Sequence, residues 1–142
     1  MKVIAKKKKS IAWLYGILSV LGALSFILSS LINNDQVVFL GLFGVFLFAA
    51  GLVLFIQNVK IPNDIISVDE SVGRIYLHPQ DVSISALSIS DVSYRESRLR
   101  YASFSWGTII ITTPNEVYEY HCVDNCEQVA KNLLRIIYSH KN

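Results

Sequence analysis

Cys122 and Cys126, with His121 beside the first, are the residues whose types and spacing come closest to a metal site. A structural zinc ion takes four ligands, commonly in closely spaced pairs. The sequence has no second Cys/His pair, and nothing in the spacing places His78 or His140 beside this one. We therefore predict no metal ion, and we interpret both cysteines as reduced, small apolar side chains where a strand meets a helix.

The serine-rich segment from Ser83 to Ser105 is the other candidate for chemistry. Its serines alternate along the chain as the outward face of a strand requires, and no histidine stands at a position diagnostic of a nucleophile with its base. The sequence also lacks a Gly-rich phosphate loop, a G-x-S-x-G elbow, an H-E-x-x-H motif and a convincing pair of acids. We predict a protein that is not an enzyme, with no catalytic residue and no cofactor.

One basic cluster could bind a partner. It consists of three arginines and two flanking tyrosines, namely Arg95, Arg98, Arg100, Tyr94 and Tyr101. A solvated strand edge in which Glu96 pairs with an arginine would explain it. The alternative is a contact site for an acidic partner or for the membrane surface, because Arg and Tyr are enriched at binding hot spots. The sequence leaves both interpretations open.

A second basic run, Lys6, Lys7, Lys8 and Lys9, lies within residues 1–10, which we expect to form a polybasic cytoplasmic tail. Such lysines set the orientation of a following membrane span. They also bind anionic lipid headgroups, an attraction screened beyond a Debye length. The two roles are compatible.

Two apolar segments decide where these residues can lie. Ile11–Ile32 has 22 residues and Val37–Ile56 has 20, with only residues 33–36 between them. At a rise of 1.5 Å per residue they measure about 33 and 30 Å, which matches a hydrocarbon core of about 30 Å. Neither has the polar face of a soluble helix. We predict an antiparallel transmembrane hairpin over residues 11–57.

The charges around the hairpin indicate its orientation. Lysines precede the first segment, Lys60 follows the second, and the loop between them contains no Lys or Arg. The positive-inside rule then places both termini in the cytoplasm, in a multi-pass protein of the cytoplasmic membrane. A cleavable signal peptide is the alternative. The first segment is too long for a usual signal core, and no small-x-small cleavage site precedes polar sequence.

A small β-rich domain is expected after the linker at residues 58–63, where Pro62 bars continuation of the helix. Short β-like runs follow, at residues 65–69, 74–78, 82–86, 91–95, 99–106, 107–113 and 117–122. Asn125 and Gln128 then suggest a capping box, and apolar residues at helical spacing predict an amphipathic helix that ends near Tyr138. The predicted class is α+β: a helical hairpin, then about seven strands and one closing helix over residues 64–142.

Three motifs in this domain follow one another in a fixed order. They are Leu-Ser-Ile-Ser-Asp-Val-Ser at residues 87–93, Trp-Gly-Thr-Ile-Ile-Ile-Thr-Thr at 106–113 and Val-Asp-Asn-Cys-Glu-Gln-Val-Ala at 123–130. Together they resemble the bacterial PH-like domains, over residues 65–139. The resemblance implies a seven-strand split barrel capped by the helix, and a binding or scaffolding role. We therefore expect an accessory subunit of a membrane complex, which would bind the lipid bilayer and a membrane protein or a second copy. The alternative is a self-immunity protein against membrane-active peptides, since some small membrane proteins with this domain resemble such factors.

Charge narrows the choice of ligand. Some eukaryotic PH domains bind phosphoinositides through a cationic loop between their first two strands, whereas the corresponding loop here, Asp69-Glu70-Ser71-Val72, is acidic. From Lys60 to Asn142 the chain has 8 Lys or Arg and 10 Asp or Glu, a net charge of −2. We therefore expect neither a phosphoinositide nor a nucleic acid as ligand.

Overall fold

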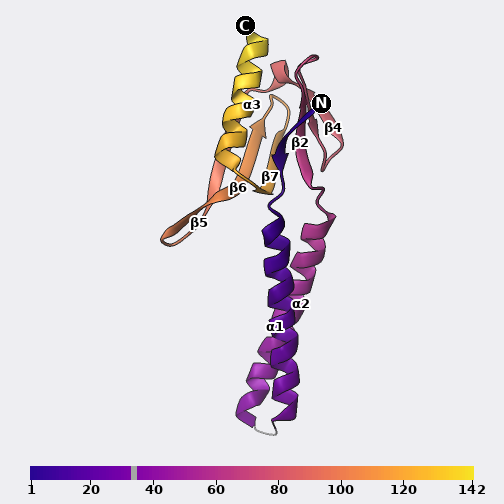
Figure 1. Cartoon of the computed structure of the whole chain (residues 1–142), viewed down its shortest axis with the longest axis vertical. Helices are drawn as coiled ribbons and strands as arrows, with labels where there is room; N and C mark the ends of the chain where they lie inside the picture. The colour runs from indigo at the N-terminus through magenta and orange to yellow at the C-terminus, as the bar shows by residue number, and fades with distance from the viewer. Residues whose placement is uncertain (33–34) are drawn as a thin grey trace. The chain divides into compact units, whose positions relative to one another are not determined.

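The computed structural model describes residues 1–32 and 35–142 and divides them into two compact units (Figure 1). The first, here called the helical hairpin, is Lys9–Ile61. The second, here called the β-domain, combines Met1–Lys8 with Pro62–Asn142. The fold is α+β, as predicted, and the hairpin is inserted in the sequence of the β-domain.

The helical hairpin consists of α1 (Lys9–Leu31) and α2 (Asp35–Lys60). The helices lie side by side and approach closely at Gly22 and Gly44. A Cβ atom on Gly22 would lie 2.5 Å from the amide nitrogen of Phe48 and 2.7 Å from the carbonyl oxygen of Gly44. Side chains larger than hydrogen would therefore force the two backbones apart.

The outer surface of the hairpin is apolar. Its exposed large side chains include Trp13, Leu31, Phe39, Leu42 and Phe46. Both helices are long and apolar enough to cross a membrane, and only 17% of the most apolar window of each is buried inside the structure. A core helix of a soluble protein buries far more of its apolar surface than this.

The β-domain contains two antiparallel sheets. The first has the order β1-β2-β3-β4, with β1 (Lys2–Lys6), β2 (Asp64–Asp69), β3 (Arg74–Leu77) and β4 (Val82–Ser85). A 3-10 turn at Ala86–Ser88 leads to the second sheet, β5-β6-β7, with β5 (Asp91–Leu99), β6 (Ala102–Thr112) and β7 (Val117–Val123). The chain ends in α3 (Cys126–Lys141).

One hydrophobic core joins these elements. The amphipathic helix α3 buries Val129, Ala130, Leu133, Ile136 and Ile137. They belong to the same cluster as residues from both sheets, among them Ile66, Val68, Ile75, Ile109 and Ile111. The predicted closing helix and its apolar stripe are therefore present.

The amino terminus differs from the predicted tail. Residues 2–6 form strand β1, which pairs with β2 in the register Lys2↔Val68, Ala5↔Ile66 and Lys6↔Asp64. The backbone amide of Lys8 donates to Cys122, and that of Asp124 donates to Lys6, so β1 also joins the first sheet to the end of β7. Ala5 is 0% exposed and belongs to the core. The lysines conceal this strand in the sequence, because they flank only three apolar residues.

This strand changes two further expectations. The described residues, 1–32 and 35–142, form seven strands, of which six lie after the hairpin and one precedes it. The expected linker at residues 58–63 is shorter, because α2 continues to Lys60 and only Ile61–Asn63 separate it from β2. The chain thus leaves the sheet after β1 and returns to pair with the same strand.

Candidate functional site

The extension of β5 and β6 is an exposed part of the β-domain. Residues 95–106, here called the arm, form a two-stranded ribbon whose paired ends project beyond α3 (Figure 1). The register Arg98↔Ser103 and Leu99↔Ala102 leaves Arg100 and Tyr101 at the turn. Arg100 has φ 24°, a conformation uncommon for a residue with a side chain.

A bulge lies near the base of the arm. The register between β5 and β6 shifts between Glu96 and Arg98. Gly107 lies opposite Glu96, and a Cβ atom on it would lie 2.1 Å from the carbonyl oxygen of Arg95. Such a bulge increases the local twist, and it re-aims the strands that follow.

The structure places all five residues of the predicted basic cluster on or beside the arm, with exposed side chains. Arg95 Nη2 lies 3.8 Å from Glu119 Oε1, in an exposed pair that contributes little free energy. Glu119, on β7, thus takes the role that the solvated-edge interpretation gave to Glu96. The guanidinium of Arg100 lies 5.9 Å from the ring centroid of Tyr101.

The arm also carries apolar side chains that the sequence analysis assigned to ordinary strands. Leu99 is 71% exposed and Tyr101 is 94% exposed. Phe104, also exposed, and Trp106 pack with ring centroids 5.7 Å apart. The alternation of Phe104 and Trp106 with Ser103 and Ser105 was the available signal for an amphipathic ribbon.

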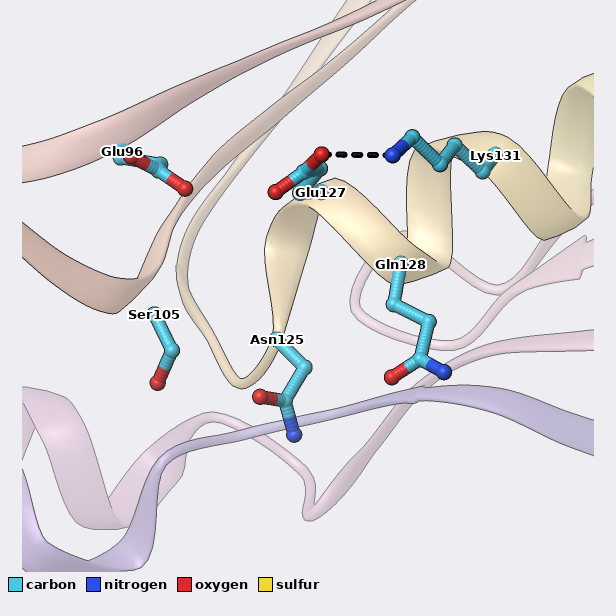
Figure 2. Close-up of a pocket in the computed structure, with 6 residues that line it drawn as sticks. All are labelled: Glu96, Ser105, Asn125, Glu127, Gln128 and Lys131. Atoms are coloured by element: carbon cyan, nitrogen blue, oxygen red, sulfur yellow. Dashed lines mark hydrogen bonds and ion pairs between the residues drawn. The ribbon is translucent and has the colours of Figure 1, made fainter.

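A polar pocket of 370 Å³ lies between the base of the arm and the first turns of α3 (Figure 2). Glu96 and Ser105 come from the arm, and the other lining residues are Asn125, Glu127, Gln128 and Lys131. Lys131 Nζ donates to Glu127 Oε1 across 2.6 Å, and this contact raises the pKa of Lys131. The pocket lining therefore has two carboxylates, Glu96 and Glu127, and one ammonium, Lys131, of which Glu127 and Lys131 are paired with each other.

Asn125 begins α3 in a different way from the predicted capping box. It has φ 48° and ψ 50°, and its side chain makes no capping hydrogen bond. The residue before it, Asp124, instead accepts a hydrogen bond from Lys8 Nζ at 2.9 Å. The left-handed conformation turns the chain sharply from β7 into the helix, which places Asn125 in the pocket wall.

The lysine run is divided between different surroundings. Lys6 is an exposed residue of β1, Lys7 is buried, and Lys8 pairs with Asp124 at 2.9 Å. Lys9 is the first residue of α1. These side chains are therefore positioned by the β-domain and by the start of the hairpin, rather than by a separate tail.

The residues considered for a metal site are dispersed. His121 Nδ1 contacts Thr108 Oγ1 at 2.9 Å, while Cys126 lies in the core and Cys122 is half-buried. His78 bonds to Ser67, and His140 bonds to the backbone of α3 and of Glu70. Within residues 1–32 and 35–142, no three His, Cys, Asp or Glu side chains are grouped so as to hold a metal ion.

One pair has the geometry of a nucleophile and its base. Ser67 Oγ lies 2.8 Å from His78 Nε2. Ser67 is only 1% exposed, inside strand β2, so a substrate carbonyl could not reach its hydroxyl. The contact instead satisfies a buried polar group.

The extent of the β-domain also corrects the charge estimate. With β1 included, residues 1–8 and 62–142 contain 11 Lys or Arg and 10 Asp or Glu, a net charge of +1. The loop that was expected to join the first two strands, Asp69–Val72, in fact joins β2 to β3. The hairpin occupies the first connection, so long-range repulsion of anionic surfaces no longer follows.

Comparison with known proteins gives this chain no relative, because no family model, no curated protein and no solved structure matches it.

Proposed function

We propose that this chain is a membrane-anchored binding protein, an accessory or scaffold subunit in which a PH-like β-domain recognises a membrane protein partner. The observation that carries the proposal is the insertion of the hairpin between the paired strands β1 and β2. Because the chain leaves the sheet after β1 and returns to it at β2, the β-domain is connected to the hairpin at two points.

The exposed apolar surface of the hairpin supports the membrane part of this proposal. Side chains such as Phe39 and Phe46 would aggregate in water but are stable in hydrocarbon. The lysines before α1 and Lys60 at the end of α2 favour an orientation with both termini in the cytoplasm.

The β-domain supports the binding part. Two sheets of four and three strands with a closing helix fit a split barrel of the PH-like kind. Its exposed surface offers Arg and aromatic side chains, while the hydroxyl of Ser67 in its Ser–His pair is buried.

The test is crosslinking of the tagged full chain in intact cells, followed by extraction in mild detergent and mass spectrometry. We expect the chain in the membrane fraction after alkaline washing, with one partner in stoichiometric amount. Ala5→Asp puts a charge in the core of the β-domain and should abolish capture, whereas Val3→Asp, on the same strand but exposed, should retain it. Release by the alkaline wash, or equal capture by Ala5→Asp, would contradict the proposal.

A further inference from the structure

We propose that the arm contacts the anionic lipid headgroups of the membrane that holds the helical hairpin. This inference rests on the membrane anchoring proposed above, and it assigns the arginine cluster to a lipid surface rather than to a protein.

The charge of the arm is the first reason. Residues 95–106 contain three arginines and one acid, Glu96. Glu96 lines the pocket beside α3, and Arg95 forms an ion pair with Glu119. The exposed cations at the end of the ribbon are therefore Arg98 and Arg100. With a net charge of +1 the β-domain as a whole does not oppose an anionic surface.

The second reason is the apolar content of the same segment. Leu99 and Tyr101 extend from the turn with most of their surface in solvent. Aromatic side chains with a polar group are enriched at the level of lipid headgroups, where their rings lie in the apolar layer and the polar group stays hydrated. Arginine beside such residues is also typical of a segment that lies at the membrane–water interface.

The shape of the surface favours lipid over protein. A hollow at the base of the arm is lined by Tyr94, Arg95, Glu96 and Arg98, whereas Leu99, Arg100 and Tyr101 lie beyond it at the exposed turn of a two-stranded ribbon. A headgroup layer requires charge and amphipathic rings but no shape complementarity.

Because the connections between the β-domain and the hairpin are short, even a weak contact is sufficient to keep the arm on the membrane surface. Two residues separate β1 from α1, and three separate α2 from β2. With at most about 3.6 Å per residue, these connections confine the β-domain to the surface of the bilayer once the hairpin is inserted. The arm then binds at a high effective concentration.

The test uses single-tryptophan versions of the full chain, which has two tryptophans, Trp13 and Trp106. Trp13→Phe, Trp106→Phe and Tyr101→Trp together place one tryptophan at the tip of the arm. In nanodiscs of phosphatidylcholine with phosphatidylglycerol we expect spin-labelled headgroups to quench this tryptophan. In phosphatidylcholine alone, or at high salt, the quenching should be lost.

Two variants give matched controls. Arg98→Gln with Arg100→Gln should weaken the contact roughly 30-fold, because each arginine near an anionic surface strengthens binding about fivefold. Arg74→Gln with Arg135→Gln removes two exposed arginines from β3 and α3 and should change nothing. With Trp13→Phe and Trp106→Phe, Tyr138→Trp places the single tryptophan near the opposite end of α3 from the pocket, where it should stay unquenched.

Failure of the two proposals can be distinguished. The Trp106→Phe chain keeps only Trp13, near the start of α1, which shallow lipid quenchers must reach if the hairpin is inserted. Quenching of Trp13 without quenching at position 101 in anionic discs overturns the inference about the arm and leaves the anchor intact. An unquenched Trp13 overturns the anchor itself.

Discussion

The sequence does not distinguish the three arginines of the basic cluster, but their surroundings in the structure differ. Arg95 lies before the bulge and pairs with Glu119 on β7. Arg98 and Arg100 lie beyond it, where β5 has no neighbour except β6. Their guanidinium groups are therefore accessible to an external anion, and the bulge between Glu96 and Arg98 lies between them and Arg95.

Gly107→Ala tests the bulge. The added methyl group would lie 2.1 Å from the Arg95 carbonyl oxygen and 2.8 Å from Glu96 Cα, and these backbone atoms cannot move aside. We expect the free energy of unfolding to fall by roughly 1–3 kcal/mol, measured by denaturant unfolding in mild detergent. Gly16→Ala is the control, because its methyl group would meet only Phe55, at 3.8 Å. Equal stability of the two variants would show that the close approach at Gly107 is absent.

The buried ionisable groups predict loss of stability at alkaline pH. Burial raises the pKa of the Cys122 and Cys126 thiols above the ordinary value of 9.0, and burial also raises the pKa of Tyr120. The folded state therefore keeps these protons while the unfolded chain loses them. Stability should be fully present below about pH 8 and should decline as the pH rises above about 9.

Thermal unfolding followed by circular dichroism across this range measures the effect. A variant with Cys122→Ala and Cys126→Ala should show a shallower decline, because only the tyrosine contribution is left. Stability that rises above pH 9 would contradict the assignment.

Strand β1 is the element whose role is least visible in the sequence. Its five residues pair with β2, and the backbone next to it bonds to Cys122 and Asp124 at the end of β7. A tail would contribute nothing to the stability of the domain, whereas a strand that joins both sheets should be essential to it.

Ala5→Asp distinguishes these two possibilities. Its carboxylate would lie in the core beside Ile66, without a partner, and we expect a loss of about 3–5 kcal/mol in the free energy of unfolding. Val3 is 37% exposed, so Val3→Asp should cost less than about 1 kcal/mol. Both variants are compared by chemical denaturation of the full chain. Similar stability of the two would mean that β1 does not pack as described.

At the scale of the whole molecule, the hairpin and the β-domain are folded units that share two chain connections. The hairpin packs through Gly22 and Gly44, and the β-domain packs around its own core. Since β1 and β2 are paired on either side of the insertion, the chain ends of the hairpin are attached to neighbouring strands. This arrangement should favour insertion of both helices together.

Orientation is the prediction that belongs to this scale. Because the lysines flank the hairpin and none lies between its helices, the carboxyl-terminal tag should survive protease added outside sealed cells. It should be digested once the membrane is permeabilised, which controls for intrinsic resistance. Digestion in sealed cells would show the opposite orientation. Cys122 and Cys126 would then lie outside the expected reducing compartment.

The sequence by itself determined the features that depend on local pattern. Unbroken apolar runs gave the two long helices, period-two alternation gave most strands after residue 63, and period 3.6 gave α3. It also identified the arginine cluster, because Arg and Tyr are enriched at binding hot spots.

Only the tertiary structure decided the features that depend on pairing across the chain. Strand β1 is stabilised by β2, more than fifty residues away, and no local signal reveals such a partner. Because β1 belongs to the domain, the net charge of the domain is +1 instead of the −2 expected from the sequence. For the same reason the acidic loop is the second connection between strands and not the first. The arm likewise became visible only when the register of β5 and β6 showed a ribbon extending past every neighbouring strand, because exposure is a property of packing and not of sequence.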